Sequence, residues 1–187
     1  MMKDRERAID SILKFLEDET KRILLVRGYD HNAKARVVLS CLNAMFDRGI
    51  IRTNSMSNIS YRIHQAFDFK KKFLPDAVKS TISYKIGDMT IRINSYGSNT
   101  KVDLKGNENT FTLYFPVQLV LKNQKDYNDF LNDIKNCNSR KIILITTNEW
   151  SIKDWDIEKH VDEVFFYDVE HDNQQLMSNL RNNGAIQ

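Results

Sequence analysis

The feature that most constrains the fold is the order of three patterns between residues 23 and 54. The aliphatic run ILLVR (23–27) has charge on one side and glycine on the other, which is typical of a strand buried on both faces of a parallel sheet. Over 33–46, apolar residues recur at spacings of three and four, and Gly49 stands where such a helix would stop. The sequence therefore predicts a strand, a short glycine-led loop, a helix and a second strand in GIIRTN (49–54).

The rest of the chain continues this alternation. Helical spacing predicts helices near 4–18, 57–67, 124–137 and 173–182, and strand-like runs occupy 140–148 and 163–169. Alternating residues on both sides of Gly87-Asp88 predict a β-hairpin near 80–96. Because parallel strands need crossover helices, we expect a single α/β domain over 1–187: a mainly parallel sheet covered by helices on both faces. We expect the hairpin to be inserted into that core rather than to be part of it.

The segment GYDHNAKA (28–35) has the place and part of the spacing of a phosphate-binding loop. That motif is Gly, four residues, Gly-Lys and then Ser or Thr, between a strand and a helix. Here Gly28 and Lys34 are in register, Ala33 replaces the second glycine and Ala35 replaces the hydroxyl residue that would hold Mg²⁺. Backbone N–H groups at a helix N-terminus and a lysine attract phosphate, and Ala33 opposes a positive φ by roughly 1–2 kcal/mol. The candidate phosphate-binding residues are Gly28, Asn32, Ala33, Lys34 and Ala35.

In this loop and this order of elements, the chain resembles the P-loop NTPases, in particular their AAA+-like branch. The resemblance implies a Walker B strand in FTLYFPVQLVL (111–121), which in that family ends in an acidic residue that holds the metal. Pro116, Val117 and Gln118 occupy that place, and the segment contains no Asp or Glu. Without that carboxylate, the transition-state charge on phosphate is poorly neutralised, which opposes efficient hydrolysis.

The resemblance also implies a sensor strand in IILITTNEW (142–150), ending in polar residues near the terminal phosphate. Thr146, Thr147 and Asn148 fit that position. The function implied is a degenerate P-loop NTPase-like module that binds ATP, GTP or phosphate, or serves as a scaffold. No residue is assigned a catalytic role, and the two cysteines, Cys41 and Cys137, form no metal-binding motif.

Each candidate also has a simpler structural role. Gly28 would close a strand-helix turn, and Lys34 would be solvated in the first helical turn. Asp30 would cap the helix, since it repels phosphate. The polar residues 146–148 would satisfy a strand-end turn. Asp168, at the end of an apolar strand, is the one further acid placed like a site residue, because ligands gather at the carboxyl ends of strands in open α/β sheets.

Charge is unevenly distributed along the chain. Residues 48–105 carry 11 basic and 4 acidic groups (+7), whereas 106–187 carry 8 and 13 (−5). A basic segment attracts nucleic acid or an acidic partner, so DNA, RNA, a protein partner and a homo-oligomer remain open as alternatives. The candidate nucleic-acid contacts are Arg62, Lys70, Lys71, Lys72 and Lys79, with the aromatic residues Tyr61, Phe67, Phe69 and Phe73 interleaved. Solvated lysines and core aromatics are the structural alternative.

The apolar positions near the N-terminus are interrupted by charges, and no stretch has 18 uninterrupted apolar residues. The sequence therefore predicts neither a signal peptide nor a membrane span. With two cysteines and no CxxC motif, we expect a cytoplasmic protein.

Overall fold

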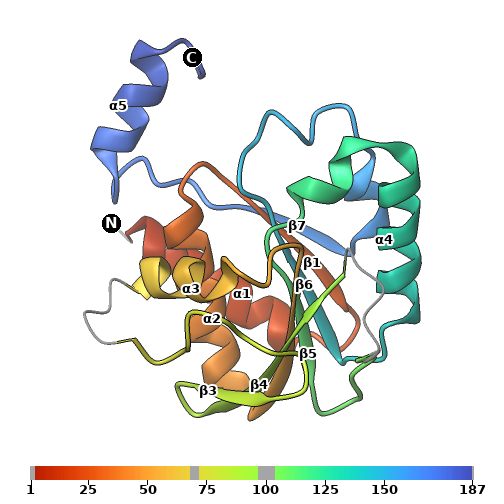
Figure 1. Ribbon diagram of the computed structural model, residues 1–187. Coiled ribbons are helices and arrows are strands. Elements are labelled where there is room, and N and C mark those ends of the chain that lie inside the picture. Colours follow the sequence, from red (N-terminus) through yellow and green to blue (C-terminus); the bar gives the residue numbers. More distant parts are fainter. Residues whose placement is uncertain (1–2, 68–71, 97–103, 187) are drawn as a thin grey trace.

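The computed structural model describes residues 3–67, 72–96 and 104–186, along which strands and helices alternate (Figure 1). The strands are β1 (Ile23–Arg27), β2 (Arg48–Thr53), β3 (Ser83–Ile86), β4 (Met89–Ser95), β5 (Phe111–Tyr114), β6 (Lys141–Ile145) and β7 (Glu163–Phe166). The α-helices are α1 (Asp4–Glu17), α2 (His31–Met45), α3 (Ile59–Phe67), α4 (Gln124–Asn136) and α5 (Gln174–Asn182). Two 3₁₀ helices, η1 (Gln118–Lys122) and η2 (Ile157–His160), complete the described elements.

The strands form one seven-stranded sheet in the order β3-β4-β2-β5-β6-β1-β7. All neighbours are parallel except β3 and β4, which form the hairpin expected within 80–96. The α/β class and the hairpin are confirmed, but the expectation that the hairpin stands outside the core was wrong. β4 pairs with β2 in parallel over six residue pairs, so the hairpin forms one edge of the main sheet.

Three runs in the second half of the chain contain shorter strands than their patterns predict. β5 ends at Tyr114, where Pro116 soon removes a backbone donor, and the last part of the 111–121 segment is helix η1. β6 and β7 end at Ile145 and Phe166, before the last residues of the runs 140–148 and 163–169. These last residues lie in the loops at the carboxyl ends of the strands.

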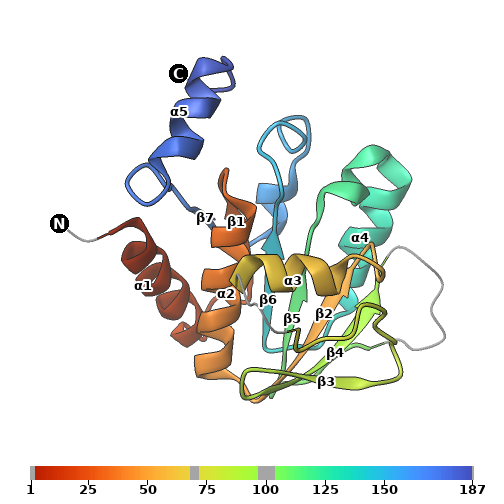
Figure 2. The ribbon, with the colours of Figure 1, turned by 60° about the vertical axis from the view of Figure 1, so that its left-hand side comes forward.

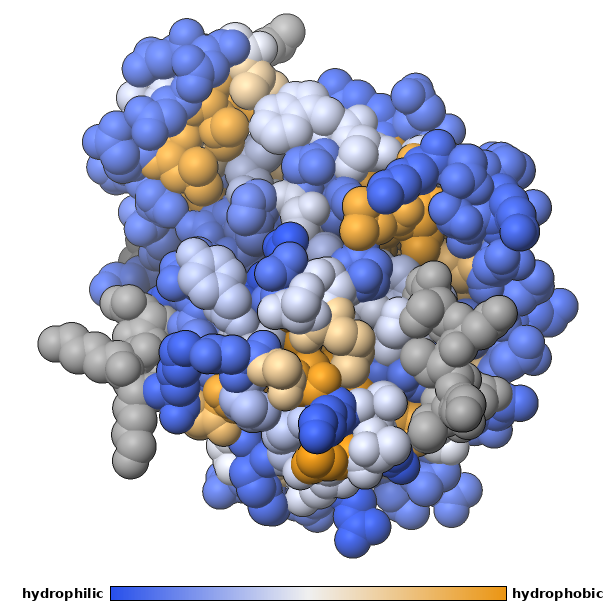
Figure 3. Space-filling model, in the orientation of Figure 1, coloured by the Kyte–Doolittle hydropathy of each residue, from blue (hydrophilic) through white to orange (hydrophobic). Residues whose placement is uncertain are grey.

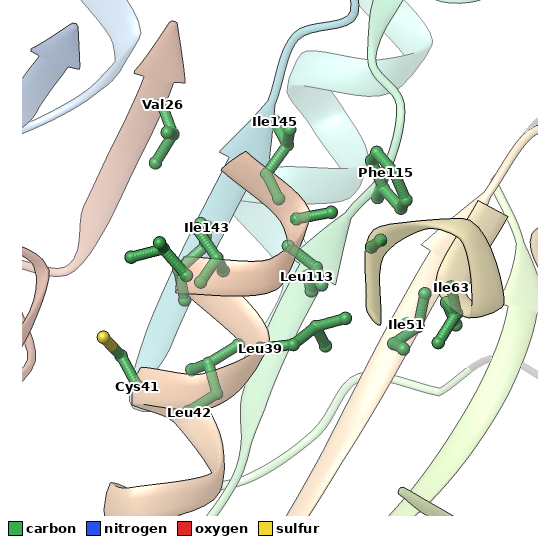
Figure 4. Close-up of a cluster of buried hydrophobic side chains, with 14 of the residues drawn as sticks. Val26, Leu39, Cys41, Leu42, Ile51, Ile63, Leu113, Phe115, Ile143 and Ile145 are labelled. Atoms are coloured by element: carbon green, nitrogen blue, oxygen red, sulfur yellow. The ribbon is translucent and has the colours of Figure 1, made fainter. Parts of the chain in front are cut away.

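Alternation along the strands divides the core into two layers. Leu24 and Val26 of β1 face helices α1, α2 and α3, whereas Leu25 faces α4 and η1. The same alternation holds in β6, where Ile143 packs on the first side and Leu144 on the second. Figure 2 shows the two helical layers, and Figure 4 shows side chains of α2, α3, β1, β2, β5 and β6 that meet in the first layer.

A buried lysine ties the end of α1 to the sheet. Lys141 is 1% exposed, and its Nζ donates hydrogen bonds to the carbonyl oxygens of Phe15 (2.9 Å), Asp18 (2.6 Å) and Lys21 (2.6 Å). Because the last carbonyls of a helix lack partners within the helix, a cation at this end satisfies them and interacts favourably with the helix dipole.

Helix α5 lies away from the sheet, beside the start of α1 (Figure 1). One side of α5 is hydrophobic and faces the rest of the molecule (Figure 3), and Met177 on it is buried against the first core layer. Asp4 links the two elements, because its carboxylate accepts hydrogen bonds from the backbone N–H groups of His171 (2.6 Å) and Asp172 (3.1 Å). Burial alone raises the pKa of Asp4, but these hydrogen bonds and that of Arg7 together lower it to about 2.

None of the helices in the three described ranges combines the length and the apolar character needed to cross a membrane.

Candidate functional site

The candidate site lies at the carboxyl ends of β1 and β6, which are neighbouring parallel strands. Gly28 follows β1 with a φ of 130°, a backbone conformation that side chains other than glycine rarely adopt. A Cβ atom at this position would lie 2.4 Å from the carbonyl oxygen of Tyr167. The backbone conformation of this turn and its close packing against Tyr167 therefore require a glycine, whether or not a ligand binds.

The loop is shorter than the phosphate-loop spacing implies. Helix α2 begins at His31, which leaves only Gly28, Tyr29 and Asp30 between strand and helix. Asp30 caps the helix as expected: one carboxylate oxygen accepts from the N–H of Ala33 (2.9 Å), and the other accepts from Nδ2 of Asn173 (2.7 Å). Ala33 is helical, so the anticipated positive-φ strain does not arise. A carboxylate thus occupies the helix N-terminus where a phosphate would bind.

Lys34 is fully buried. The alternative structural role predicted for it, a solvated lysine in the first helical turn, was therefore wrong. Its Nζ donates to the carbonyl oxygen of Gly28 and to Oγ1 of Thr146 (3.2 Å). Burial lowers the pKa of Lys34 to about 8, against the opposing effect of the charges of Glu149 and Asp30. The lysine therefore joins the loop after β1 to the end of β6.

Glu149, which was not among the predicted site residues, also holds this loop. This side chain is 5% exposed, and its carboxylate accepts from the backbone N–H of Gly28 (2.8 Å) and from Nε of Arg27 (2.8 Å). Thr146 Oγ1 lies 3.3 Å from the same carboxylate. An acid three residues after Thr146 was the available signal. Together Gly28, Lys34, Thr146 and Glu149 form what we call the loop network.

The segment in which the resemblance implies a Walker B acid contains an amide instead of a carboxylate. Gln118, in η1, accepts from the backbone N–H of Thr147 (2.6 Å) and donates to the carbonyl oxygen of Asn148 (3.0 Å). Gln118 thus ties the end of the β5 segment to two of the three sensor-like residues. Among the described residues, no group of three or more His, Cys, Asp or Glu side chains is arranged to hold a metal ion.

The remaining predicted residues lie elsewhere. Ala35 is buried in the core, whereas Asn32 is exposed on the first turn of α2. Asp168 is exposed beyond β7, and its carboxylate accepts from the N–H of Glu170 (3.0 Å). Of the five candidate phosphate-binding residues, the structure brings only Gly28 and Lys34 together with Thr146.

Part of the basic segment lines an open cleft beside α3. This α3 cleft has a volume of about 390 Å³, and none of its described lining residues is acidic. It is lined by His31, Asn32, Asn58, Tyr61, Arg62, Gln65 and Phe115. Tyr61 is 65% exposed, which is unlike a core aromatic.

The other candidate nucleic-acid contacts are not gathered there. Lys72 is paired with Asp76 (2.5 Å), and Lys79 is exposed on another part of the surface. Phe67 and Phe73 pack partly against the core, as their structural alternative predicts. Three further candidates, Lys70, Lys71 and Phe69, lie outside the described residues.

The order and direction of the strands define the class of fold, which is a RecA-like α/β fold. A solved structure with a similar fold is the SWI2/SNF2 ATPase core of Sulfolobus solfataricus in complex with dsDNA, with a TM-score of 0.55 and 16% sequence identity. The match covers 84% of this chain and 35% of that chain, so this chain corresponds to about a third of the matched protein. No protein-family model and no curated protein sequence matches the chain.

Proposed function

We propose that this chain is a P-loop NTPase-like module that serves as a scaffold and does not hydrolyse nucleotide efficiently. The observation that carries the proposal is the loop network, in which Lys34 binds the protein's own Gly28 carbonyl and Thr146 hydroxyl. The groups that would bind the phosphates of ATP or GTP are thereby engaged within the protein.

Three further features fit a nucleotide poorly at this loop. The carboxylate of Asp30 already accepts the N–H of Ala33 at the start of α2 and would repel a phosphate. Ala35 has no hydroxyl for Mg²⁺, and Gln118 stands where a metal-holding carboxylate would be required. Phosphoryl transfer depends mainly on positioning and on neutralising charge, and these residues provide neither at the loop.

Steady-state hydrolysis of Mg·ATP and Mg·GTP by the purified protein tests this proposal. We expect no turnover above background, and we expect Lys34→Ala to leave that background unchanged. Turnover of about 1 s⁻¹, an ordinary rate for an ATPase, would contradict the proposal if Lys34→Ala abolished it. A thermal-shift series with both nucleotides complements this test, since a ligand that binds only the native state raises its melting temperature.

A second candidate function is binding of nucleic acid at the α3 cleft. The observation that favours it is that the exposed Tyr61 ring, the Arg62 guanidinium and several amide side chains share a cleft whose described lining contains no acid. Aromatic rings stack on bases and arginine binds phosphate, and both interactions tolerate any sequence. The similar solved structure is a complex with dsDNA, which makes duplex DNA a probe to include.

Fluorescence anisotropy with labelled single-stranded DNA, RNA and duplex DNA tests this candidate at low and moderate salt. We expect salt-sensitive binding that Tyr61→Ala and Arg62→Ala weaken, while Arg48→Ala, at an exposed arginine at the start of β2, has little effect. Absence of binding at low salt, or equal weakening by all three substitutions, would remove the candidate.

A further inference from the structure

A second pocket lies behind the loop, where the first turns of three helices meet. Lys3 is the N-cap residue of α1, Asn32 lies in the first turn of α2, and Asn173 is the N-cap residue of α5. All three line one pocket of about 530 Å³, which we call the three-helix pocket. In Figure 2 the starts of α1 and α5 lie on the same side of the molecule. The N–H groups at the starts of α2 and α5 are already capped by Asp30 and Asn173, so an anion in this pocket would be bound by side chains.

Three cationic side chains add full charges to this pocket: Lys3, Arg5 and Arg36. Within the described residues, none of the three forms an ion pair. Arg36 donates from Nε to the carbonyl of Ala66, which leaves its two terminal nitrogens available as donors. These donors can bind a phosphate through several oxygens at once.

The two acids of the pocket already have partners that are not cationic side chains. Asp30 accepts from Ala33 and Asn173, as described above, and Asp172 accepts from the backbone N–H of Arg5 (2.7 Å). The charged lining side chains sum to +1, so the pocket carries a net positive charge before an anion binds. The buried carboxylate of Asp4 ties the start of α1, which carries Lys3 and Arg5, to the backbone of residues 171–172.

One wall of the pocket suits an organic body attached to the anion. This wall is formed by Val37, Val169 and Tyr167, each of which is at most 3% exposed. Burial raises the pKa of Tyr167 to about 12, so its hydroxyl remains a hydrogen-bond donor at neutral pH. The pocket volume lies within the range of small-molecule sites, which combine apolar walls with a few placed polar groups.

We propose that the three-helix pocket binds a small phosphate monoester, with its phosphate held by Lys3, Arg5 and Arg36 and its organic part against Val37 and Val169. This proposal is independent of the proposed function, since the phosphate lies outside the loop network and Lys34 takes no part. The chemistry common to inorganic phosphate, nucleoside monophosphates and sugar phosphates is the dianionic PO₃ group, and the choice of probes separates them.

Isothermal titration calorimetry at constant ionic strength tests the proposal with inorganic phosphate, AMP, glucose 6-phosphate and adenosine. We expect at least one of the organic phosphates to bind more tightly than inorganic phosphate, and adenosine to bind at least tenfold more weakly than AMP. The double variant Lys3→Ala/Arg5→Ala should weaken phosphate-ester binding by about tenfold or more, the factor expected for losing charge-assisted hydrogen bonds. Both side chains are exposed, so this variant should fold.

The matched control is Lys14→Ala/Arg48→Ala, which removes the same charge from exposed sites away from the pocket. Binding should be unchanged in this control and in Lys34→Met. The proposal is overturned if no phosphorylated probe binds, or if the control double variant weakens binding as much as Lys3→Ala/Arg5→Ala. Binding that is lost only in Lys34→Met would place the anion at the loop and would contradict both this inference and the closed loop network.

Discussion

The loop network predicts an unusual pH dependence of stability that depends on Lys34. Burial lowers the pKa of this lysine from its ordinary value of 10.5 to about 8. Each pKa unit corresponds to 1.36 kcal/mol, so holding the charged lysine in the folded protein costs about 3 kcal/mol at neutral pH. Between about pH 8 and 10.5 the unfolded chain retains this proton while the folded protein releases it. The contribution of Lys34 to stability therefore rises as the pH increases through this window.

Substitution by methionine removes the titrating group and keeps a side chain of similar length. Urea unfolding of wild type and Lys34→Met at pH 7 and pH 10 gives the difference between their free energies of unfolding, in which the titrations of other groups cancel. We expect that difference to shift by about 2 kcal/mol in favour of the wild type between the two pH values. Exposed Lys122→Met is the control, and its difference should stay constant within about 0.5 kcal/mol.

If the difference between the free energies of unfolding of wild type and Lys34→Met is also constant with pH, the pKa of Lys34 is not lowered by burial. It would mean that Lys34 is solvated and free to reach a ligand, and the closed loop network would then have no physical basis.

Three other substitutions and conditions test the local geometry. Gly28→Ala should lower the free energy of unfolding by at least about 2 kcal/mol, because the positive φ and the contact with a backbone carbonyl both oppose a Cβ atom. A loss below about 0.5 kcal/mol in urea unfolding would contradict this expectation. Lys141→Met should cost about 2–4 kcal/mol, measured in the same way, since three carbonyl groups lose their donor; a neutral result would show that water replaces it. His64 Nε2 accepts the backbone N–H groups of residues 73 and 74, and burial and then the charge of Lys72 lower its pKa below 6.5. Its contribution to stability is therefore present above pH 6.5 and lost as the pH falls further, so melting temperatures of wild type and His64→Gln should converge towards pH 5; parallel curves would rule this out.

Hydrophobic pattern alone predicted the architecture, because burial on both sheet faces leaves a strong signal. Runs such as 24–26 and 142–145 are apolar and buried at every position, and the helices between them repeat at three and four. The role of the hairpin was mispredicted because periodicity reports which residues are buried and carries no information about which strand is the neighbour. β4 alternates in the same way whether it pairs with β2 or stands apart.

The candidate site was predicted only in part, since its contacts are long-range. Spacing places Gly28 and Lys34 in one loop, but the burial of Lys34 depends on Thr146, which is 112 residues away. Glu149 reaches Gly28 across 121 residues, and nothing in the sequence near the loop indicates it. The capping role of Asp30 was predictable because a helix N-cap is local. The three-helix pocket could not be predicted because its contacts are also long-range: residues near both ends of the chain line it.

The loop after β1 is closed by the protein's own side chains. A crystal structure grown with Mg²⁺ and a non-hydrolysable ATP analogue would show whether it stays closed when a nucleotide is offered. We expect Nζ of Lys34 to stay on the Gly28 carbonyl and the Thr146 hydroxyl, with α2 beginning at His31 and the Asp30 cap in place. A structure in which Lys34 has moved onto the β- or γ-phosphate, with residues 28–33 opened around it, would contradict it.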